Sequence, residues 1–441
     1  MTITASRLGT SPITVDWSSL ASVSAGTSLK GNSVDVEAIQ TAWSRLKISF
    51  QQGDVGFYDA PVNNDLCRAD ESQALADEIT REGKFTDCLF LGIGGSSLGP
   101  ISWIGAMSEK TNPRLKFHFM ENPDPVEWKT TVSRLTPATT LVCAITKSGT
   151  TFETVAQFLL ALQWLGRELW KSNVVVITDP AKGDLRSFAT REGLRTLPIA
   201  PSMGGRFSIF TPVGLFPAAL AGLNIRNFLT GAKQVRDQIE KGPLEKNPLF
   251  ILASELIRHS VKRDVHVCMP YSSRLRLLGT WFVQLWGESL GKDGKGFTPL
   301  AAVGATDQHS ILQLLRDGPD DKITFFIAVD QVEDVVMIPK LAAGAGSAAL
   351  PAFRILEGHS LHELLMIEYR ATSQVLTRQG RPNLTIRMDR LDERALGALY
   401  FGFSVLTAVT GTMMGVNPFD QPGVEEGKVY IRDALNQNPE S

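Results

Sequence analysis

The sequence contains few cysteines, and no two of them are close enough to form a metal or redox motif. The four cysteines, Cys67, Cys88, Cys143 and Cys268, are spread along 441 residues without a CxxC spacing. This pattern argues against a zinc cage or a redox dithiol, and we expect no metal. Cys88, Cys143 and Cys268 lie in apolar runs that predict buried strands, where a free cysteine acts as a small hydrophobic side chain.

Positive and negative charges are nearly balanced in the sequence. The chain carries 44 Lys and Arg against 46 Asp and Glu, a formal net charge of −2. This balance provides no general basic surface to attract nucleic acid or an anionic membrane. There is no uninterrupted apolar run of about 18 residues and no secretory signal pattern at the N-terminus. We therefore expect a cytoplasmic protein without a nucleic-acid or membrane partner.

Short apolar runs alternate with helical patterns, which predicts an α/β fold of two or three domains. Strands are expected at 87–95, 115–124, 140–149, 173–180, 194–200, 264–270, 321–330 and 382–389. Helices are expected at 35–50, 152–170, 274–291, 359–379 and 396–416. Strands spaced in this way favour parallel sheets covered by helices on both faces. Residues 1–35 show little periodicity and are interpreted as a surface arm.

Two loops that follow predicted strands have the composition of phosphate sites. They read GIGGSSLGP (92–100) and ITKSGTTFET (145–154). Ligands of parallel sheets bind beyond the carboxyl ends of the strands, where a helix N-terminus offers free N–H groups to an anion. Glycine allows the backbone to approach the phosphate closely, and the serine and threonine hydroxyls add donors. Two such turns on neighbouring strands point to one small phosphate monoester.

Other interpretations of these loops remain open at this point. The first loop matches a dinucleotide fingerprint at Gly92 and Gly94, with Glu121 downstream, but Ser97 occupies the third glycine position. Neither loop has the pattern of a nucleoside triphosphate site. The hydroxyl side chains could also serve only as helix caps.

Further motifs show a resemblance to a known family. The loops GIGGSSLGP and TKSGTTFET, followed by MGGRFSIFTPVG (203–214), WGESLGK (286–292), GATDQHSILQLL (304–315) and FDQPGVEEGK (419–428), resemble motifs of glucose-6-phosphate isomerases. The matches occur in family order from 92 to 428, which makes the resemblance specific. Ser97 stands where many members have Asp, and Pro422 where relatives often have Trp.

The resemblance implies a fold of two sugar-isomerase domains. We divide the chain into an N-terminal arm and helix (1–45), a first sugar-isomerase domain that binds phosphate (46–205), a second such domain (206–390), and a C-terminal helical segment (391–441). It also implies the reversible isomerisation of glucose 6-phosphate to fructose 6-phosphate, in glycolysis and gluconeogenesis. Ring opening and C2–C1 proton transfer through a cis-enediolate require no redox cofactor.

The resemblance further implies roles for individual residues. Glu288 would be the base, Arg206 would stabilise the enediolate, and His309 and Lys428 would open the ring. His309 would come from the partner subunit of a homodimer. The residues expected to bind the phosphate or sugar are Gly95, Ser96, Thr146, Lys147, Ser148, Thr151 and Gln421. Without the resemblance, Glu288 would be interpreted as a solvated helix-end residue, Lys428 as a surface lysine, and Arg206 equally well as part of a salt bridge.

Two alternatives share the implied fold. A sugar-phosphate-binding regulator without catalytic activity would be expected to lack the base, whereas Glu288 is present. A dual glucose and mannose phosphate isomerase would be expected to be more divergent and to lack this pair of full signatures.

Overall fold

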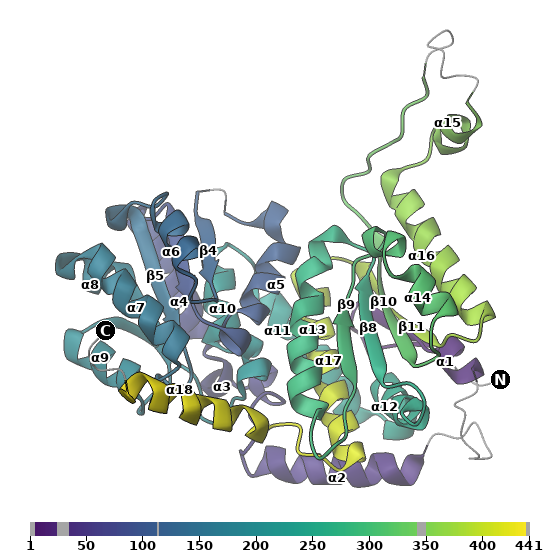
Figure 1. Cartoon of the computed structure of the whole chain (residues 1–441), viewed down its shortest axis with the longest axis horizontal. Helices are drawn as coiled ribbons and strands as arrows, with labels where there is room; N and C mark the ends of the chain where they lie inside the picture. The colour runs from purple at the N-terminus through teal and green to yellow at the C-terminus, as the bar shows by residue number, and fades with distance from the viewer. Residues whose placement is uncertain (1–4, 24–34, 113, 342–349, 438–441) are drawn as a thin grey trace.

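Two β-sheets, one in each half of the molecule, organise the fold (Figure 1). The structure is a computed structural model, and it describes residues 5–23, 35–112, 114–341 and 350–437. The expected α/β class, with parallel sheets flanked by helices, is confirmed.

The first sheet is entirely parallel, in the order β4-β3-β5-β6-β7. Its strands are β3 (Asp87–Leu91), β4 (Lys116–Met120), β5 (Thr140–Ile145), β6 (Val174–Thr178) and β7 (Arg195–Pro198). The chain leaves β3 toward β4 on one side and returns to β5 on the other. The carboxyl ends of β3 and β5 therefore flank the point where the winding reverses, which is where such sheets bind ligands.

Both faces of this sheet are buried, which explains the continuous apolar runs in the sequence. On β5 every residue is buried. Val142 faces a cluster with Phe158 and Leu162 of α7 (Phe152–Leu165), while Cys143 belongs to the main core on the other face.

The second sheet is mixed, in the order β1-β2-β11-β10-β8-β9. Its strands are β1 (Ala5–Arg7), β2 (Ile13–Asp16), β8 (Val265–Pro270), β9 (Thr298–Ala301), β10 (Lys322–Gln331) and β11 (Asn383–Arg390). The expectation of a surface arm is wrong for residues 5–16. They form a hairpin that pairs antiparallel with β11 and buries Ile13 and Val15. Three or four residues per strand are too few for a clear alternating pattern.

Helices cover both sheets and connect them. Those near the first sheet are α3 (Asn64–Cys67), α4 (Ala69–Glu82), α5 (Leu98–Ala106), α6 (Pro125–Val132), α7, α8 (Trp170–Asn173), α9 (Asp184–Glu192) and α10 (Pro212–Leu220). The others are α1 (Ser18–Ser22), α2 (Val36–Gln51), α11 (Ile225–Lys241), α12 (Pro248–His259), α13 (Arg276–Leu290), α14 (Leu312–Asp317), α15 (Pro351–Leu356), α16 (Leu361–Arg378), α17 (Glu393–Met414) and α18 (Glu425–Gln437).

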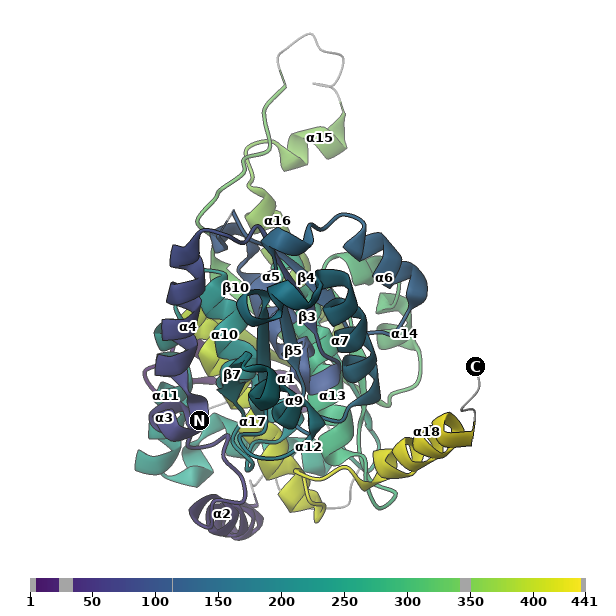
Figure 2. The ribbon, with the colours of Figure 1, turned by 90° about the vertical axis from the view of Figure 1, so that its left-hand side faces the viewer.

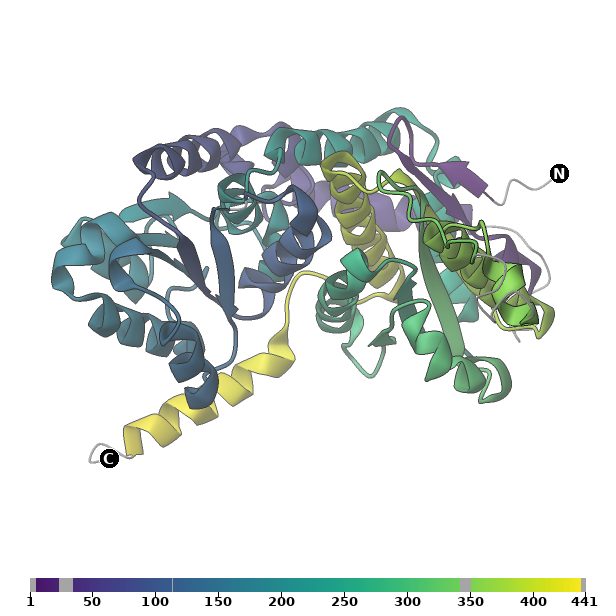
Figure 3. The same cartoon turned by 90° about the horizontal axis from the view of Figure 1, so that it is seen from above.

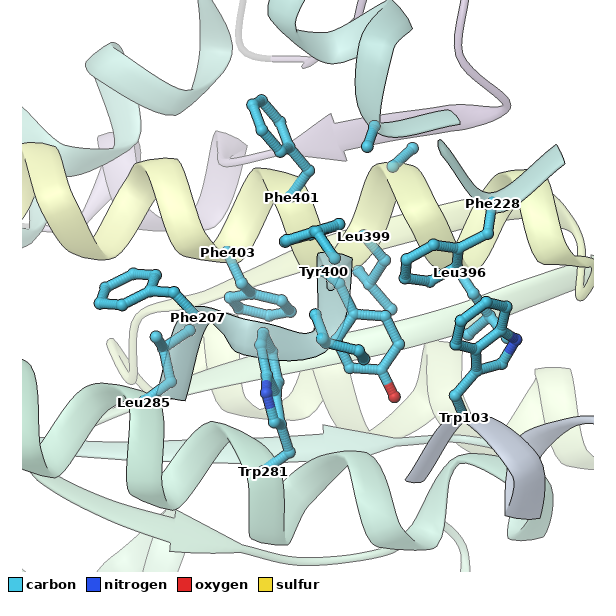
Figure 4. Close-up of a cluster of buried hydrophobic side chains, with 14 of the residues drawn as sticks. Trp103, Phe207, Phe228, Trp281, Leu285, Leu396, Leu399, Tyr400, Phe401 and Phe403 are labelled. Atoms are coloured by element: carbon cyan, nitrogen blue, oxygen red, sulfur yellow. The ribbon is translucent and has the colours of Figure 1, made fainter. Parts of the chain in front are cut away.

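Helix α17 forms the centre of the main core. Its length and composition would allow it to span a membrane, but 89% of its most apolar window is buried inside the protein, as in a core helix. Tyr400 and Phe403 point toward Trp281 of α13, while Phe401 points to the opposite side (Figure 4). A Cβ at Gly397 would lie 1.8 Å from the carbonyl oxygen of Phe228, so glycine allows α17 to touch α11. This packing connects the two halves through one continuous core.

Two segments extend from the body. The first is an arm, defined here as the described residues 332–341 and 350–359, which carries α15 and stands away from the sheets (Figure 2). The second is α18, which runs along the outer side of the first half (Figure 3). No residue of α18 is buried.

Candidate active site

The glycine-rich loop after β3 packs directly against the segment that carries Arg206. Residues Gly94–Ser96 form the 3₁₀ helix η2, and the carbonyl oxygen of Gly95 accepts a hydrogen bond of 3.1 Å from Ser208. A Cβ at Gly95 would lie only 2.3 Å from the carbonyl carbon of Gly205. Glycine is therefore required here for a close approach of two backbones. Ser96 is partly buried beside this contact.

The loop after β5 collects hydroxyl groups at the start of α7. The hydroxyls of Thr146 and Thr151 lie 2.7 Å apart, and that of Ser148 lies 3.3 Å from that of Thr151. Thr151 is the N-cap of α7, yet its side chain makes no capping hydrogen bond. The hydroxyls and the first N–H groups of the helix together form an arrangement of donors that suits an anion.

Lys147 in this loop directs its ammonium group toward the protein. Its Nζ donates a 2.8 Å hydrogen bond to the carbonyl oxygen of Pro201. Burial lowers the pKa of Lys147, and the Asp179 carboxylate opposes this shift. The side chain thus links the loop to the segment that precedes Arg206.

Arg206 is the most highly connected residue of the site. It lies in the 3₁₀ helix η6 (Gly205–Phe210), and only 2% of its side chain is exposed. Its Nε donates to the hydroxyl of Ser289 at 2.6 Å, and its Nη1 donates to Oε1 of Gln421 at 2.9 Å. Its Nη2 donates to the carbonyl oxygens of Pro418 at 2.6 Å and Asp420 at 2.9 Å. Arg206 therefore joins α13 to the loop that follows α17.

Glu288 completes this arrangement near the end of α13. Its Oε2 lies 3.3 Å from Nη1 of Arg206, and its side chain is 34% exposed. Gln284, one helical turn earlier, donates from Nε2 to Oε1 of Glu288 at 3.1 Å. A Cβ at Gly94 would lie 2.8 Å from the same Nε2, so the glycine-rich loop reaches this end of α13. Burial lowers the pKa of Arg206, and the Glu288 and Asp420 carboxylates oppose that shift.

Two expected residues are not brought to this cluster within the chain. His309 ends the 3₁₀ helix η9 (Thr306–His309) and is exposed, and its side chain makes no hydrogen bond or ion pair with any described residue. Lys428 on α18 is 53% exposed, and its Nζ pairs with Glu425 at 2.7 Å. A single chain therefore assembles Arg206, Glu288 and Gln421 but neither of the residues expected to open the ring.

Two residues of the cluster escaped prediction from the sequence. Gln284 precedes Glu288 by four residues, and this helical spacing could have identified it as a neighbour of the carboxylate. Ser289 follows Glu288 in a buried position, and only the tertiary structure reveals its contact with Arg206.

The arrangement combines a hydroxyl-rich loop at a helix N-terminus with a carboxylate and a buried guanidinium. A carboxylate can accept a proton, and a fixed guanidinium can stabilise an oxyanion that forms beside it. In the described ranges, no group of three or more His, Cys, Asp or Glu side chains is placed to hold a metal ion.

The sequence is similar to a known family and to several of its named members. A family model described as phosphoglucose isomerase matches residues 77–441. A protein from Rubrobacter xylanophilus named glucose-6-phosphate isomerase is 40% identical over 430 residues, covering 94% of this chain and 96% of the relative. A protein of the same name from Carboxydothermus hydrogenoformans is 35% identical, covering 89% and 87%.

Two solved structures have a fold similar to that of this chain. A Thermus thermophilus protein described as hypothetical superposes with a TM-score of 0.83 at 35% identity, covering 90% of this chain and 94% of the other. A glucose-6-phosphate isomerase from Chlamydia trachomatis has a TM-score of 0.79 at 20% identity, covering 99% and 90%. The second likeness supports the fold alone.

Proposed function

The chain belongs to the phosphoglucose isomerase family and interconverts glucose 6-phosphate and fructose 6-phosphate, and we propose that Glu288 and Arg206 perform the proton transfer. The observation that carries this proposal is the 3.3 Å contact between Oε2 of Glu288 and Nη1 of Arg206. This contact lies beside the glycine-rich loop, so a substrate bound there would meet both groups.

The phosphate is proposed to bind at the loop after β5. Thr146, Ser148 and Thr151 would donate their hydroxyl hydrogens, and the first N–H groups of α7 would add further bonds. Hydrogen bonds to a charged group are worth about 1.5–3 kcal/mol each, so three of them anchor the substrate firmly. Gly95 and Ser96 on the neighbouring strand end would close the other side of the substrate, and Gln421 would contact sugar oxygens.

Glu288 would then move one proton between C2 and C1 of the opened sugar. Abstraction of a proton next to a carbonyl produces a negatively charged enediolate oxygen, which needs a fixed positive partner. Arg206 is suited to this role because its other nitrogens are already bound to Ser289, Pro418 and Asp420. Its guanidinium needs no reorganisation when the charge forms.

Ring opening is proposed to require Lys428 from α18 and His309 from a partner. A cavity of about 1060 Å³ lies between α18 and the first half, lined by Ile431 and Leu435 on one side and by α7 and α9 on the other. Because α18 buries no residue, it has room to move as the substrate binds. Such a movement would bring Lys428 closer to the sugar.

The base assignment is tested with Glu288→Gln, which keeps the shape and removes the carboxylate. We expect kcat and solvent deuterium exchange at C2 of glucose 6-phosphate to fall by about 10³-fold, within the range for general bases. Glu78→Gln, at an exposed surface carboxylate, serves as the control. Retention of exchange and turnover in Glu288→Gln would overturn the assignment.

We also propose that the chain acts as a homodimer. The arm exposes a group of large apolar side chains, as interaction surfaces do: Val335, Val336, Met337, Phe353 and Ile355. His309 is exposed and unpaired within the described chain, as expected of a residue that serves a neighbouring site. The free, buried cysteines support the proposed cytoplasmic location.

Complementation tests the sharing of His309. Glu288→Gln and His309→Ala are each expected to be nearly inactive alone. If each site takes its histidine from the partner, a mixed dimer contains one intact site. Unfolding and refolding an equal mixture should therefore restore about a quarter of the wild-type activity, since half of the dimers are mixed. No recovery in dimers that demonstrably mix would place His309 in its own chain's site.

A further inference from the structure

Lys292, two residues after the end of α13, has a largely buried side chain to which the proposed reaction assigns no role. Only 8% of its side chain is exposed. Its Nζ donates to the carbonyl oxygens of Ser289, at 3.1 Å, and Asn417, and forms an ion pair with Oδ1 of Asp420 at 3.0 Å. A buried ammonium is costly unless it is paired and hydrogen-bonded, so the question is what these contacts maintain.

The contacts of Lys292 lie on the same two segments that hold Arg206. Arg206 is bonded to the Ser289 side chain at the end of α13 and to the Pro418 and Asp420 carbonyl oxygens in the loop after α17. Lys292 is bonded to the carbonyl oxygen of Ser289 and to the same loop. The two cations thus connect one helix end to one loop at two places.

Side-chain hydrogen bonds fix the conformation of the loop after α17, which lies between Lys292 and Arg206. Oδ2 of Asp420 accepts from Nδ2 of Asn417 at 2.9 Å, and Oδ1 of Asn417 accepts from the N–H of Phe419 at 3.0 Å. Phe419 in turn contacts Phe207, next to Arg206 in the chain, at a ring separation of 5.6 Å. A displacement of Asn417 or Asp420 would therefore move the carbonyl oxygens that orient the guanidinium.

Positive and negative side chains alternate in the series Lys292, Asp420, Arg206 and Glu288. Lys292 contacts Asp420, the Asp420 carboxylate acts on Arg206, and Arg206 contacts Glu288. Each buried cation therefore has a carboxylate partner. Removing the ammonium leaves Asp420 without its cationic partner, although Asn417 still donates to it, and frees the loop on the side opposite Arg206.

We propose that Lys292 is a positioning residue, which holds the loop of residues 417–421 so that Arg206 meets the enediolate and Gln421 meets the sugar. This inference rests on the proposed function of Arg206 and Glu288. Lys292 itself touches neither substrate nor reacting atoms; it acts through the loop. Its loss should affect the transition state more than the binding of phosphate, since the loop after β5 stays intact.

The test compares Lys292→Met with wild type in three measurements. We expect kcat to fall by about 10–100-fold and KM for glucose 6-phosphate to change by less than about three-fold, because a misplaced charge mainly affects the transition state. The affinity for a sugar-phosphate hydroxamate that mimics the enediolate should fall by the same factor as kcat. The affinity for inorganic phosphate should stay unchanged.

Lys295→Met is the matched control in the same turn, where the backbones of Lys292 and Lys295 are hydrogen-bonded to each other. Its Nζ bonds the carbonyl oxygen of Met414, outside the 417–421 loop, so activity should remain near wild type. Asp420→Ala removes the 52% exposed carboxylate and keeps the carbonyl oxygen for Arg206. It should lower kcat selectively, as Lys292→Met does, but by a smaller factor of about 3–10, and it decides the question should Lys292→Met not fold.

Several outcomes would overturn the proposal. Equal behaviour of Lys292→Met and Lys295→Met would do so, as would equal losses of affinity for the hydroxamate and for inorganic phosphate. If Glu288→Gln is inactive while Lys292→Met is normal, only this inference fails. If Glu288→Gln keeps its turnover, the proposed function of the site fails first.

Discussion

Replacing Arg206 by alanine removes the side chain that joins the two segments of the candidate site. The side chain is almost fully buried and donates to the carbonyl oxygens of Pro418 and Asp420. Each acceptor that stays buried without a donor costs about 1–3 kcal/mol. Glu288 also loses its partner, but it is 34% exposed, so water compensates much of that loss. We expect the free energy of unfolding to fall by about 2–6 kcal/mol, mainly because the two carbonyl acceptors are left without a donor.

The catalytic effect of the same change can be measured separately. Removing one preorganised donor to a developing oxyanion typically costs about 10²–10³-fold in kcat. Arg206→Lys keeps the charge, but an ammonium has three donors for the five acceptors that Arg206 contacts. We expect intermediate losses of both stability and kcat for this variant, since lysine lacks the planar fork of arginine.

The assay is guanidinium denaturation for the free energy of unfolding, together with steady-state kinetics on the folded fraction. Arg226→Ala is the control, because that side chain is 68% exposed and its ion-pair partner among the described residues is Asp70 on the surface. It should change stability by less than about 0.5 kcal/mol. The reasoning is refuted if Arg206→Ala loses less than about 1 kcal/mol, or if its kcat stays within about three-fold of wild type.

Three further predictions follow from the structure. Gly95→Ala should lower stability by about 1–3 kcal/mol and reduce activity, because a Cβ there meets the backbone of Gly205 at 2.3 Å; Gly205→Ala, whose Cβ meets nothing within 4 Å, should be tolerated in the same melting and activity assays. Thr151→Val should raise KM by about 10-fold or more with little change in kcat, since a lost hydroxyl weakens ground state and transition state equally; an unchanged KM would contradict phosphate binding there. Burial lowers the pKa of His266 to about 3, so the unfolded chain takes up a proton below about pH 6.5 while the folded one does not. Stability should therefore fall with acidification, by about 2 kcal/mol at pH 5 from this group, and His266→Gln, which can still accept from Trp286, should show a shallower pH dependence of the denaturation midpoint.

Much of the fold could be predicted because the signals are local. Strands buried on both faces, such as β5, need continuous apolar sequence, and the chain shows it. The hairpin of residues 5–16 was missed because its short strands are stabilised by pairing with β11, a partner more than 360 residues away. The short edge strand β9, only partly buried, was missed for a related reason.

The candidate site also contains parts that local sequence indicates and parts that it does not. The loops after β3 and β5 are predicted as anion sites from their residues and their position after strands, and this stays a prediction. Glu288 and Arg206 were identified only through motifs that resemble a family, because nothing local marks a helix-end carboxylate or a lone arginine as reactive. The contact of Gln284 with Glu288 could have been predicted from the four-residue helical spacing, whereas the contacts of Ser289 and Lys292 could not.

The sequence by itself determined the α/β class, most strands, the position and composition of the two loops proposed to bind the phosphate and, through its ordered motifs, the family. These follow from periodicity and from short motifs, which depend on neighbours along the chain. The tertiary structure alone decided that Arg206 joins the end of α13 to the loop after α17, that Lys292 holds the same loop, and that His309 and Lys428 lie outside the cluster of a single chain. The physical reason is that these contacts connect residues 80 to more than 200 positions apart, and only packing around the shared core brings them together.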